Sequence, residues 1–121
     1  MELQKSAKSQ NKIKGAIGET SVSIYLENEG YIIIENNYKN KIGEIDIIAK
    51  DQSERIIFIE VKARATAKFG YPREAVTKTK QNKIKLVAQT YLKLKGQTNA
   101  YIRFDVLEVL NGKITHIKNA F

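Results

Sequence analysis

The sequence predicts one α/β or α+β domain in which a mixed five-stranded sheet is flanked by helices, in the order α-β-β-β-α-β-β. Two long segments repeat apolar residues at helical spacing, and five shorter runs rich in Ile, Val and Phe are separated by polar turn residues. The 121 residues suit a single domain with a modest core. We expect the polar, Lys-rich residues 1–12 to be flexible.

The first helix is predicted over about residues 12–29, where an apolar stripe recurs at helical spacing. Gly30 follows as the residue that ends this helix. Residues 31–35 are then predicted as the first strand. Residues 36–42, which begin with two asparagines, are predicted as a turn region.

The next two strands form a hairpin between Gly43 and Lys62, in which two apolar runs flank a short polar break. Each run carries charge where a buried strand should be apolar. Asp46 follows Glu44 by two residues, and Lys62 follows Glu60 by two, so each pair shares one face of its strand. Because charged groups are rarely buried unless they are paired or bind a metal, these residues are candidates for a functional site.

The register of this hairpin decides whether the charges of its two strands meet. Directly opposed residues share a face, so Asp46 and Glu60 meet only if opposed positions sum to an even number. A four-residue loop over residues 51–54 would pair Lys50 with Arg55 and turn Glu60 to the wrong face. A shared site therefore requires a loop of three or five residues, or a bulge, and the sequence leaves these alternatives open.

A second helix is predicted over about residues 77–95, with Thr77 as its N-cap and Gly96 after its end. Its first turns carry four lysines, namely Lys78, Lys80, Lys83 and Lys85. Positive side chains are unfavourable at the N-terminal end of a helix dipole. This cost indicates that the four lysines serve another purpose, such as contact with phosphate groups.

The last two strands are predicted as a hairpin. Residues 102–109 form the fourth strand, and Asn111-Gly112 is a strong signal for a tight turn. Residues 113–118 then pair back as a fifth strand at the edge of the sheet. We expect His116 in this strand to be a surface residue rather than a metal ligand.

The net charge of +8 is concentrated in one part of the chain. Residues 62–95 contain ten Lys or Arg and one acidic residue, giving +9, while the remainder has eleven basic and twelve acidic residues. This asymmetry favours a polyanionic partner, most often nucleic acid, and we assign such binding to Arg64 and the four helix lysines. The alternative is a solvated basic face that only aids solubility.

The absence of certain residue types and segments from the sequence indicates the cellular compartment of the protein. The sequence contains no cysteine, which excludes disulfides and thiolate metal sites. No apolar run is long enough to span a bilayer, and the first residues form no apolar signal region. We therefore expect a cytoplasmic protein without a membrane partner.

An Asp on one strand and Glu-x-Lys on the next form a constellation typical of metal-dependent nucleases. Mg²⁺ and similar hard cations prefer carboxylate and carbonyl oxygens, which Asp46, Glu60 and the main chain of Val61 would supply. Such a metal polarises a phosphate and lowers the pKa of a bound water, and Lys62 would orient that water or stabilise the developing charge. The alternative is a buried ion pair between Lys62 and one of the two carboxylates.

Several short motifs occur in order along the chain: Gly15-x-x-Gly18-Glu19, Gly43-Glu44-Ile45-Asp46-Ile47-Ile48, Phe58-Ile59-Glu60-Val61-Lys62-Ala63-Arg64, Gly70-x-Pro72-x-Glu74-Ala75-Val76, Lys80-Gln81 and Arg103-Phe104-Asp105-Val106. As a set they resemble the YraN family of small bacterial proteins, and the resemblance covers nearly the whole chain. That family is similar to the restriction-endonuclease-like superfamily, with its PD-(D/E)xK signature, and to archaeal Holliday junction resolvases. Ile45 stands where the signature has proline, a position that varies across the superfamily.

The resemblance implies the nuclease fold and a metal site for Mg²⁺ or Mn²⁺ at Asp46, Glu60 and Lys62. Glu19 matches the helix glutamate that some members place beside the metal. Gln81 matches a polar residue that is often found near the site on the following helix. The resemblance brings no physiological substrate with it.

Three functions are compatible with these features. The first is a metal-dependent nuclease acting on DNA, including branched or damaged DNA, and the second is a nucleic-acid-binding module that keeps the nuclease fold without activity. The third is an interaction protein whose basic face docks an acidic partner. Asp46, Glu60 and Lys62 favour the first, since a pure binder has no need of buried charges there. A junction resolvase would also require two sites and therefore a homodimer.

Overall fold

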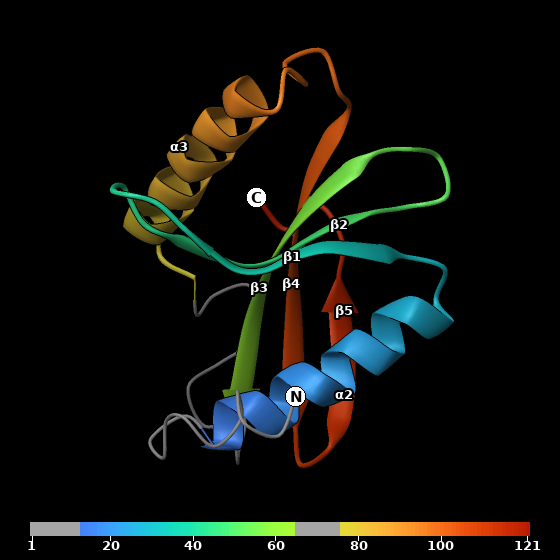
Figure 1. Cartoon of the computed structure of the whole chain (residues 1–121). Coiled ribbons are helices and arrows are strands. Elements are labelled where there is room, and N and C mark those ends of the chain that lie inside the picture. The colour runs from blue at the N-terminus through green and yellow to red at the C-terminus, as the bar shows by residue number, and fades with distance from the viewer. Residues whose placement is uncertain (1–12, 65–75) are drawn as a thin grey trace.

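The computed structural model describes residues 13–64 and 76–121, with side chains described from residue 21 to 63 and from 76 to 121. Its elements follow the predicted order (Figure 1). They are α2 (Ile13–Asn28), β1 (Ile32–Lys39), β2 (Glu44–Lys50), β3 (Ile56–Arg64), α3 (Lys78–Leu94), β4 (Ile102–Leu110) and β5 (Lys113–Ile117).

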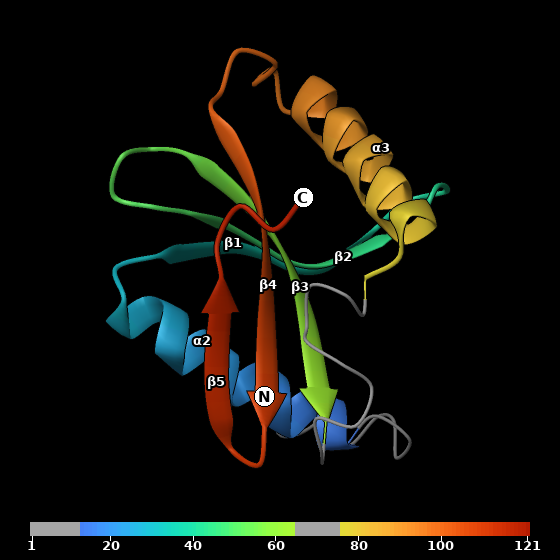
Figure 2. The ribbon, with the colours of Figure 1, turned by 180° about the vertical axis from the view of Figure 1, so that it is seen from behind.

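The five strands form one mixed sheet in the order β1-β2-β3-β4-β5. Strands β3 and β4 are parallel, and every other neighbouring pair is antiparallel. The chain passes from β3 to β4 through α3, because parallel neighbours need a crossover connection. In Figure 1, α2 lies in front of β3, β4 and β5, and in Figure 2 it lies behind them, so it covers one face of this part of the sheet.

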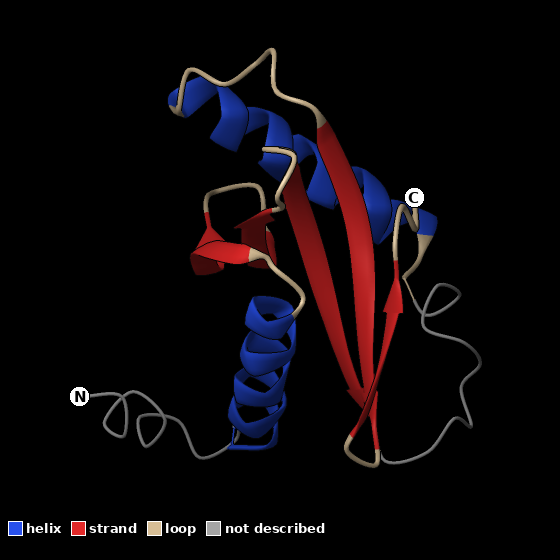
Figure 3. Cartoon of the chain, turned by 90° about the vertical axis from the view of Figure 1, so that its right-hand side faces the viewer, coloured by secondary structure: helices blue, strands red, loops and turns tan. Residues whose placement is uncertain are grey.

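Each helix buries one face of the sheet. Side chains from the sheet and α3 form one apolar cluster that includes Ile48, Phe58, Phe104, Val106, Ile84, Val87 and Tyr91. A second cluster on the side of α2 includes Val22, Leu26, Ile47, Ile57, Ile59 and Leu107. Neighbours such as Ile57 and Phe58 enter different clusters, as the alternation of side chains in a strand requires. The long strands run from the level of α2 to that of α3 (Figure 3).

Strand β1 is longer than its sequence predicted, because it continues to Lys39 through most of the expected turn region at residues 36–42. Tyr38 pairs with Ile45 of β2, and its ring meets the ring of Tyr91 edge to face at a centroid distance of 5.0 Å. This packing extends the strand past its asparagines. Tertiary burial thus overrides a local turn preference.

The loop between β2 and β3 has five residues, because Lys50 pairs with Ile56. Asp51 holds this loop closed. Its Oδ1 accepts hydrogen bonds from the main-chain N–H groups of Ser53 and Arg55, both at 2.9 Å, and its Oδ2 accepts one from Arg55 Nε at 2.7 Å. Of the alternatives that the sequence left open, the five-residue loop is therefore the one that forms.

The predicted helix and turn signals of the second half are confirmed. Thr77 is the N-cap of α3, and its hydroxyl accepts a hydrogen bond from the N–H of Lys80 at 3.1 Å. Asn111 and Gly112 connect β4 to β5 with φ angles of 51° and 80°, as a two-residue hairpin turn requires. Neither helix in the described part of the chain has the length and apolar character needed to cross a bilayer.

Candidate active site

Asp46 and Glu60 lie opposite each other on the two central strands of the hairpin. Ile47 pairs with Ile59, so extending the register by one residue brings the two carboxylates to one face. Glu60 is only 5% exposed, and Asp46 is partly buried. Asp46 Oδ2 accepts a hydrogen bond of 2.8 Å from the N–H of Val61. The predicted shared face is therefore present, while the role of both residues as metal ligands stays a prediction.

The environment of Asp46 opposes its negative charge. Burial raises the pKa of Asp46, and the charge of Glu60 raises it further, to about 7, although the hydrogen bond from Val61 acts in the opposite direction. Two carboxylates held together away from water cannot both ionise without cost. The pair is consequently a place where a cation would be stabilised.

Two lysines approach Glu60. Lys80 Nζ lies 2.7 Å from Glu60 Oε2, and Lys62 Nζ lies 3.8 Å from the same oxygen. Burial acts to lower the pKa of Lys80, but its hydrogen bond to Glu60 and the charges of Glu60, Asp46 and Glu44 raise it overall. The ion pair weighed in the sequence analysis thus exists for Lys62, but the closer partner is Lys80, which the sequence did not connect with Glu60.

Gly43 brings the start of β2 close to α3. A Cβ atom at this position would lie 3.3 Å from Cγ and Cδ of Lys83 and 3.4 Å from a methyl carbon of Val87. Its N–H is also held by Asn40, whose Oδ1 accepts a hydrogen bond from it at 3.2 Å. The missing side chain therefore lets the hairpin that carries Asp46 pack against the first turns of α3.

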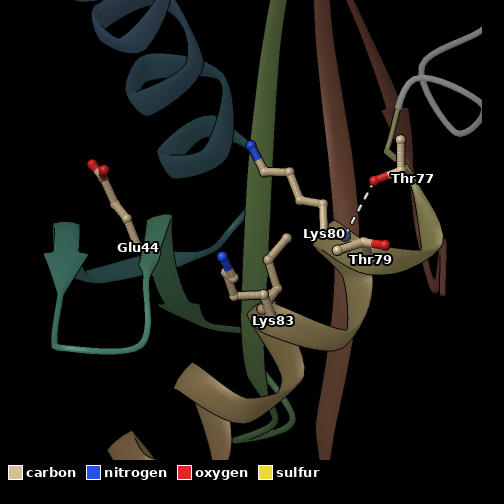
Figure 4. A pocket seen from close by; sticks show the side chains of 6 residues that line it. Glu44, Thr77, Thr79, Lys80 and Lys83 are labelled. Carbon is tan, nitrogen blue, oxygen red and sulfur yellow. Dashed lines mark hydrogen bonds between the residues drawn. The ribbon is translucent and has the colours of Figure 1, made fainter.

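A cleft of about 370 Å³ opens beside this junction, lined by Glu44, Thr77, Thr79, Lys80, Lys83 and Ile84 (Figure 4). Lys80 extends from α3 toward β3, where it meets Glu60. Lys80 therefore connects the cleft, which presents ammonium and hydroxyl groups, to the neighbouring carboxylate pair. Ammonium and hydroxyl groups are the usual contacts of phosphate oxygens in nucleic acids.

The structure brings together only two of the four lysines expected to contact phosphate. Lys80 and Lys83 line the cleft, whereas Lys78 is exposed on the same turn outside its lining. Lys85 points elsewhere, with its Nζ above the ring of Phe104 at 5.8 Å from the centroid. Helical spacing explains the division, because the side chains of residues 83 and 85 leave the helix in different directions.

Of the three remaining predicted site residues, the structure describes the side chain of Gln81 but not those of Glu19 and Arg64. Gln81 donates a hydrogen bond from Nε2 to the carbonyl oxygen of Val76 at 2.9 Å, so its amide fixes the chain where it enters α3. The side chains of Glu19 and Arg64 lie outside the described residues. The roles assigned to these three residues stay predictions.

Glu108 on β4 is a buried charged residue that the sequence analysis did not select. It is 5% exposed and pairs in register with Lys62 of β3, so it lies on the same face of the sheet as Glu60. Its signal was present in the sequence, since it follows Phe104 and Val106 at the two-residue spacing of a buried face.

The prediction that His116 is a surface residue is wrong. Its side chain is 5% exposed, and its Nε2 lies 2.7 Å from Oδ2 of the fully buried Asp105. Arg103 and the N–H of Asn119 also donate to this carboxylate, and Tyr25 OH lies 2.9 Å from the other ring nitrogen of His116. Packing of α2 against this face buries the histidine, an effect that the sequence of an edge strand cannot show.

The donor set around Asp46 and Glu60 fits a hard divalent cation. Mg²⁺ is commonly held by one or two carboxylates, with water in its other positions. The N–H of Val61 faces Asp46, and its carbonyl faces the same edge, because both polar groups of a strand residue point to one side. Within residues 13–64 and 76–121, no three His, Cys, Asp or Glu side chains gather as a complete metal cage.

Comparisons with known proteins agree with the motifs. The family model of the uncharacterised protein family UPF0102 matches residues 18–109. A UPF0102 protein of Clostridioides difficile (strain 630) is 52% identical over 113 residues, covering 92% of this chain and 98% of the relative. A UPF0102 protein of Clostridium botulinum (strain Loch Maree / Type A3) is 50% identical over 118 residues, covering 92% and 95%.

A solved structure, described as "Structure of EndoMS-dsDNA2 complex", overlaps 77% of this chain and 34% of its own, with 15% identity and a TM-score of 0.41. An overlap this loose does not establish a shared fold. The match to the family model is much stronger evidence, because the model covers the carboxylate pair, the residues that line the cleft and most of the sheet. The chain therefore belongs to the family UPF0102, which is the YraN family that its motifs resembled.

Proposed function

We propose that the protein is a metal-dependent nuclease that hydrolyses phosphodiester bonds in DNA, with Mg²⁺ or Mn²⁺ held by Asp46, Glu60 and the carbonyl of Val61. One observation carries the proposal. Two carboxylates face each other on central strands, and burial together with the charge of Glu60 raises the pKa of Asp46 to about 7. Such an arrangement costs stability and is typical of sites that bind a cation for function.

The chain itself would supply positioning and charge. A bound divalent cation would polarise the scissile phosphate and lower the pKa of a water. Lys62, with its ammonium 3.8 Å from Glu60, would orient that water or stabilise the charge that develops. Thr77, Thr79 and Lys83 would hold the phosphate backbone in the cleft. The proposal keeps Glu19 and Gln81 near the metal, as the family resemblance implies.

The positive charge of residues 62–95 indicates the chemical class of the substrate. The +9 of residues 62–95 includes both lysines of the cleft, which supports nucleic acid as the partner. Branched or damaged DNA is the substrate class we propose, and action on a four-way junction would require a homodimer. The proposal places the protein in the cytoplasm, in line with a sequence that lacks cysteine.

A second candidate is a nucleic-acid-binding module without catalysis. The observation that favours it is the 2.7 Å contact between Lys80 and Glu60, which neutralises Glu60 without any metal. The two candidates differ in what Asp46 does. In a nuclease it is required for cleavage, whereas in a binding module it has no positive role.

The test is a cleavage assay with Mg²⁺ or Mn²⁺ on end-labelled single-stranded, duplex, three-way and four-way DNA, with RNA of the same sequences. We expect Asp46→Asn to lose at least on the order of 100-fold in rate, since even outer-shell partners of a metal cost 10- to 100-fold. Glu27→Gln is the control, because Glu27 is an exposed carboxylate of α2 that does not line the cleft. Full cleavage by Asp46→Asn would refute the nuclease mechanism. Binding without cleavage of any substrate would support the second candidate.

A further inference from the structure

We propose that Lys80 is a tethered cation that occupies Glu60 in the absence of metal and must leave it before a divalent cation can bind. The inference rests on the proposed metal site and concerns how that site is controlled. It makes Lys80 a residue that sets the metal affinity of the resting protein. A divalent cation and the ammonium group would then compete for the same carboxylate.

The first support is the contact itself. Lys80 Nζ lies 2.7 Å from Glu60 Oε2, which is 1.1 Å closer than the 3.8 Å of Lys62. The Glu60 side chain is 6% exposed, so the ammonium meets it where little water competes. A charge-assisted contact of this length uses a carboxylate oxygen that a metal would also need.

The second support is that the Lys80 side chain can reach a second position, in the cleft. Its main chain is fixed in the first turn of α3, where its N–H donates to Thr77. Its side chain is 45% exposed and also lines the cleft beside Thr79 and Lys83. Rotation of its flexible four-carbon arm would carry the ammonium from Glu60 into the cleft without moving the helix.

The third support is electrostatic. A divalent cation between Asp46 and Glu60 would repel an ammonium group held against the same carboxylates. In the cleft the displaced group would meet a bound phosphate instead, at the end of the helix where negative charge is favourable. Metal entry would therefore turn Lys80 from a partner of Glu60 into a contact for the nucleic acid. The phosphate contact predicted for Lys80 from the sequence belongs to this second position.

The test measures Mn²⁺ binding by calorimetry, without nucleic acid, for the wild type, Lys80→Met and Lys83→Met. Methionine keeps the apolar arm and removes the charge. If the ion pair between Lys80 and Glu60 is formed in most molecules of the metal-free protein, only the remaining fraction can bind metal. Lys80→Met should then bind Mn²⁺ roughly 3- to 10-fold more tightly than the wild type. Lys83→Met should match the wild type, because Lys83 lines the same cleft and the structure shows no contact between it and Glu60 among the described residues.

Each outcome decides between the ideas. Tighter Mn²⁺ binding by Lys80→Met than by the wild type supports the tethered cation. Mn²⁺ binding by Lys80→Met with no detectable binding by the other two proteins supports it as well. Equal or weaker binding overturns it and leaves the metal site in place, since Lys80 would then be neutral or would help to position Glu60. Absence of Mn²⁺ binding in all three proteins overturns both the metal site and the inference. Circular dichroism confirms folding, and Lys80→Gln replaces Lys80→Met if the methionine variant does not fold.

Discussion

Replacing Asp46 by Asn should stabilise the metal-free protein at pH 8 and leave its stability almost unchanged at pH 4. The structure gives Asp46 one main-chain donor, the N–H of Val61 at 2.8 Å, and asparagine can accept the same hydrogen bond. Among the described residues, the ion pairs at this site involve Glu60 and leave Asp46 unpaired. The substitution therefore removes a costly charge and keeps the shape of the site.

The magnitude follows from the pKa. Burial and Glu60 raise the pKa of Asp46 from 3.8 to about 7, so the folded protein holds a proton that the unfolded chain has released. Stability then falls as pH rises from about 4 to 7 and stays low above that range. At about 1.36 kcal/mol for each unit of pKa, the loss amounts to about 4 kcal/mol. Asp46→Asn should recover this free energy of unfolding at pH 8.

The assay is urea unfolding in EDTA at pH 4, 6 and 8, followed by circular dichroism, for the wild type, Asp46→Asn and Glu44→Gln. The difference between wild type and Asp46→Asn cancels the titration of all other groups. It should grow with pH, whereas Glu44→Gln should follow the wild type. A difference that does not change with pH would refute the reasoning. A loss of about 3–5 kcal/mol in Asp46→Asn would show instead that Asp46 belongs to a structural ion pair.

Two further predictions concern other parts of the molecule. Asp105→Asn should cost about 3–5 kcal/mol in urea unfolding at pH 7, because it leaves Arg103 largely buried without its counter-charge. Burial acts to raise the pKa of Asp105, but its hydrogen bonds lower it overall from the ordinary 3.8, so this stabilisation should shrink progressively as pH falls below about 4. A gap that does not narrow toward low pH would contradict the assignment. Lys83→Ala should reduce the salt dependence of duplex binding by about 0.9 in the slope of log K against log salt. Lys85→Ala, whose lysine lies over Phe104, should leave the slope unchanged, and equal effects of the two variants would argue against binding in the cleft.

The sequence alone determined the elements and the family. Strand alternation, the cap at Thr77 and the Asn111-Gly112 turn are local signals, and each depends on residues only a few positions apart. The order of helices and strands therefore follows from the chain, and so does the candidate pair of Asp46 and Glu60. The family motifs add the expectation of a nuclease site to that pattern.

Only the tertiary structure decided how these parts meet. The side chain of Asp51 closes a five-residue loop, and this sets the register that brings Asp46 opposite Glu60. Lys80 reaches Glu60 across twenty residues of sequence because α3 packs against the hairpin. His116 is buried by the same kind of long-range packing. The contacts of Lys80 and His116 join segments that are distant in the chain, so no local period or spacing encodes them, and they form only when the helices close over the sheet. The hydrogen bonds of Asp51 span only two and four residues, but the sequence is compatible with more than one loop length, and the pairing of the folded sheet fixes one of them.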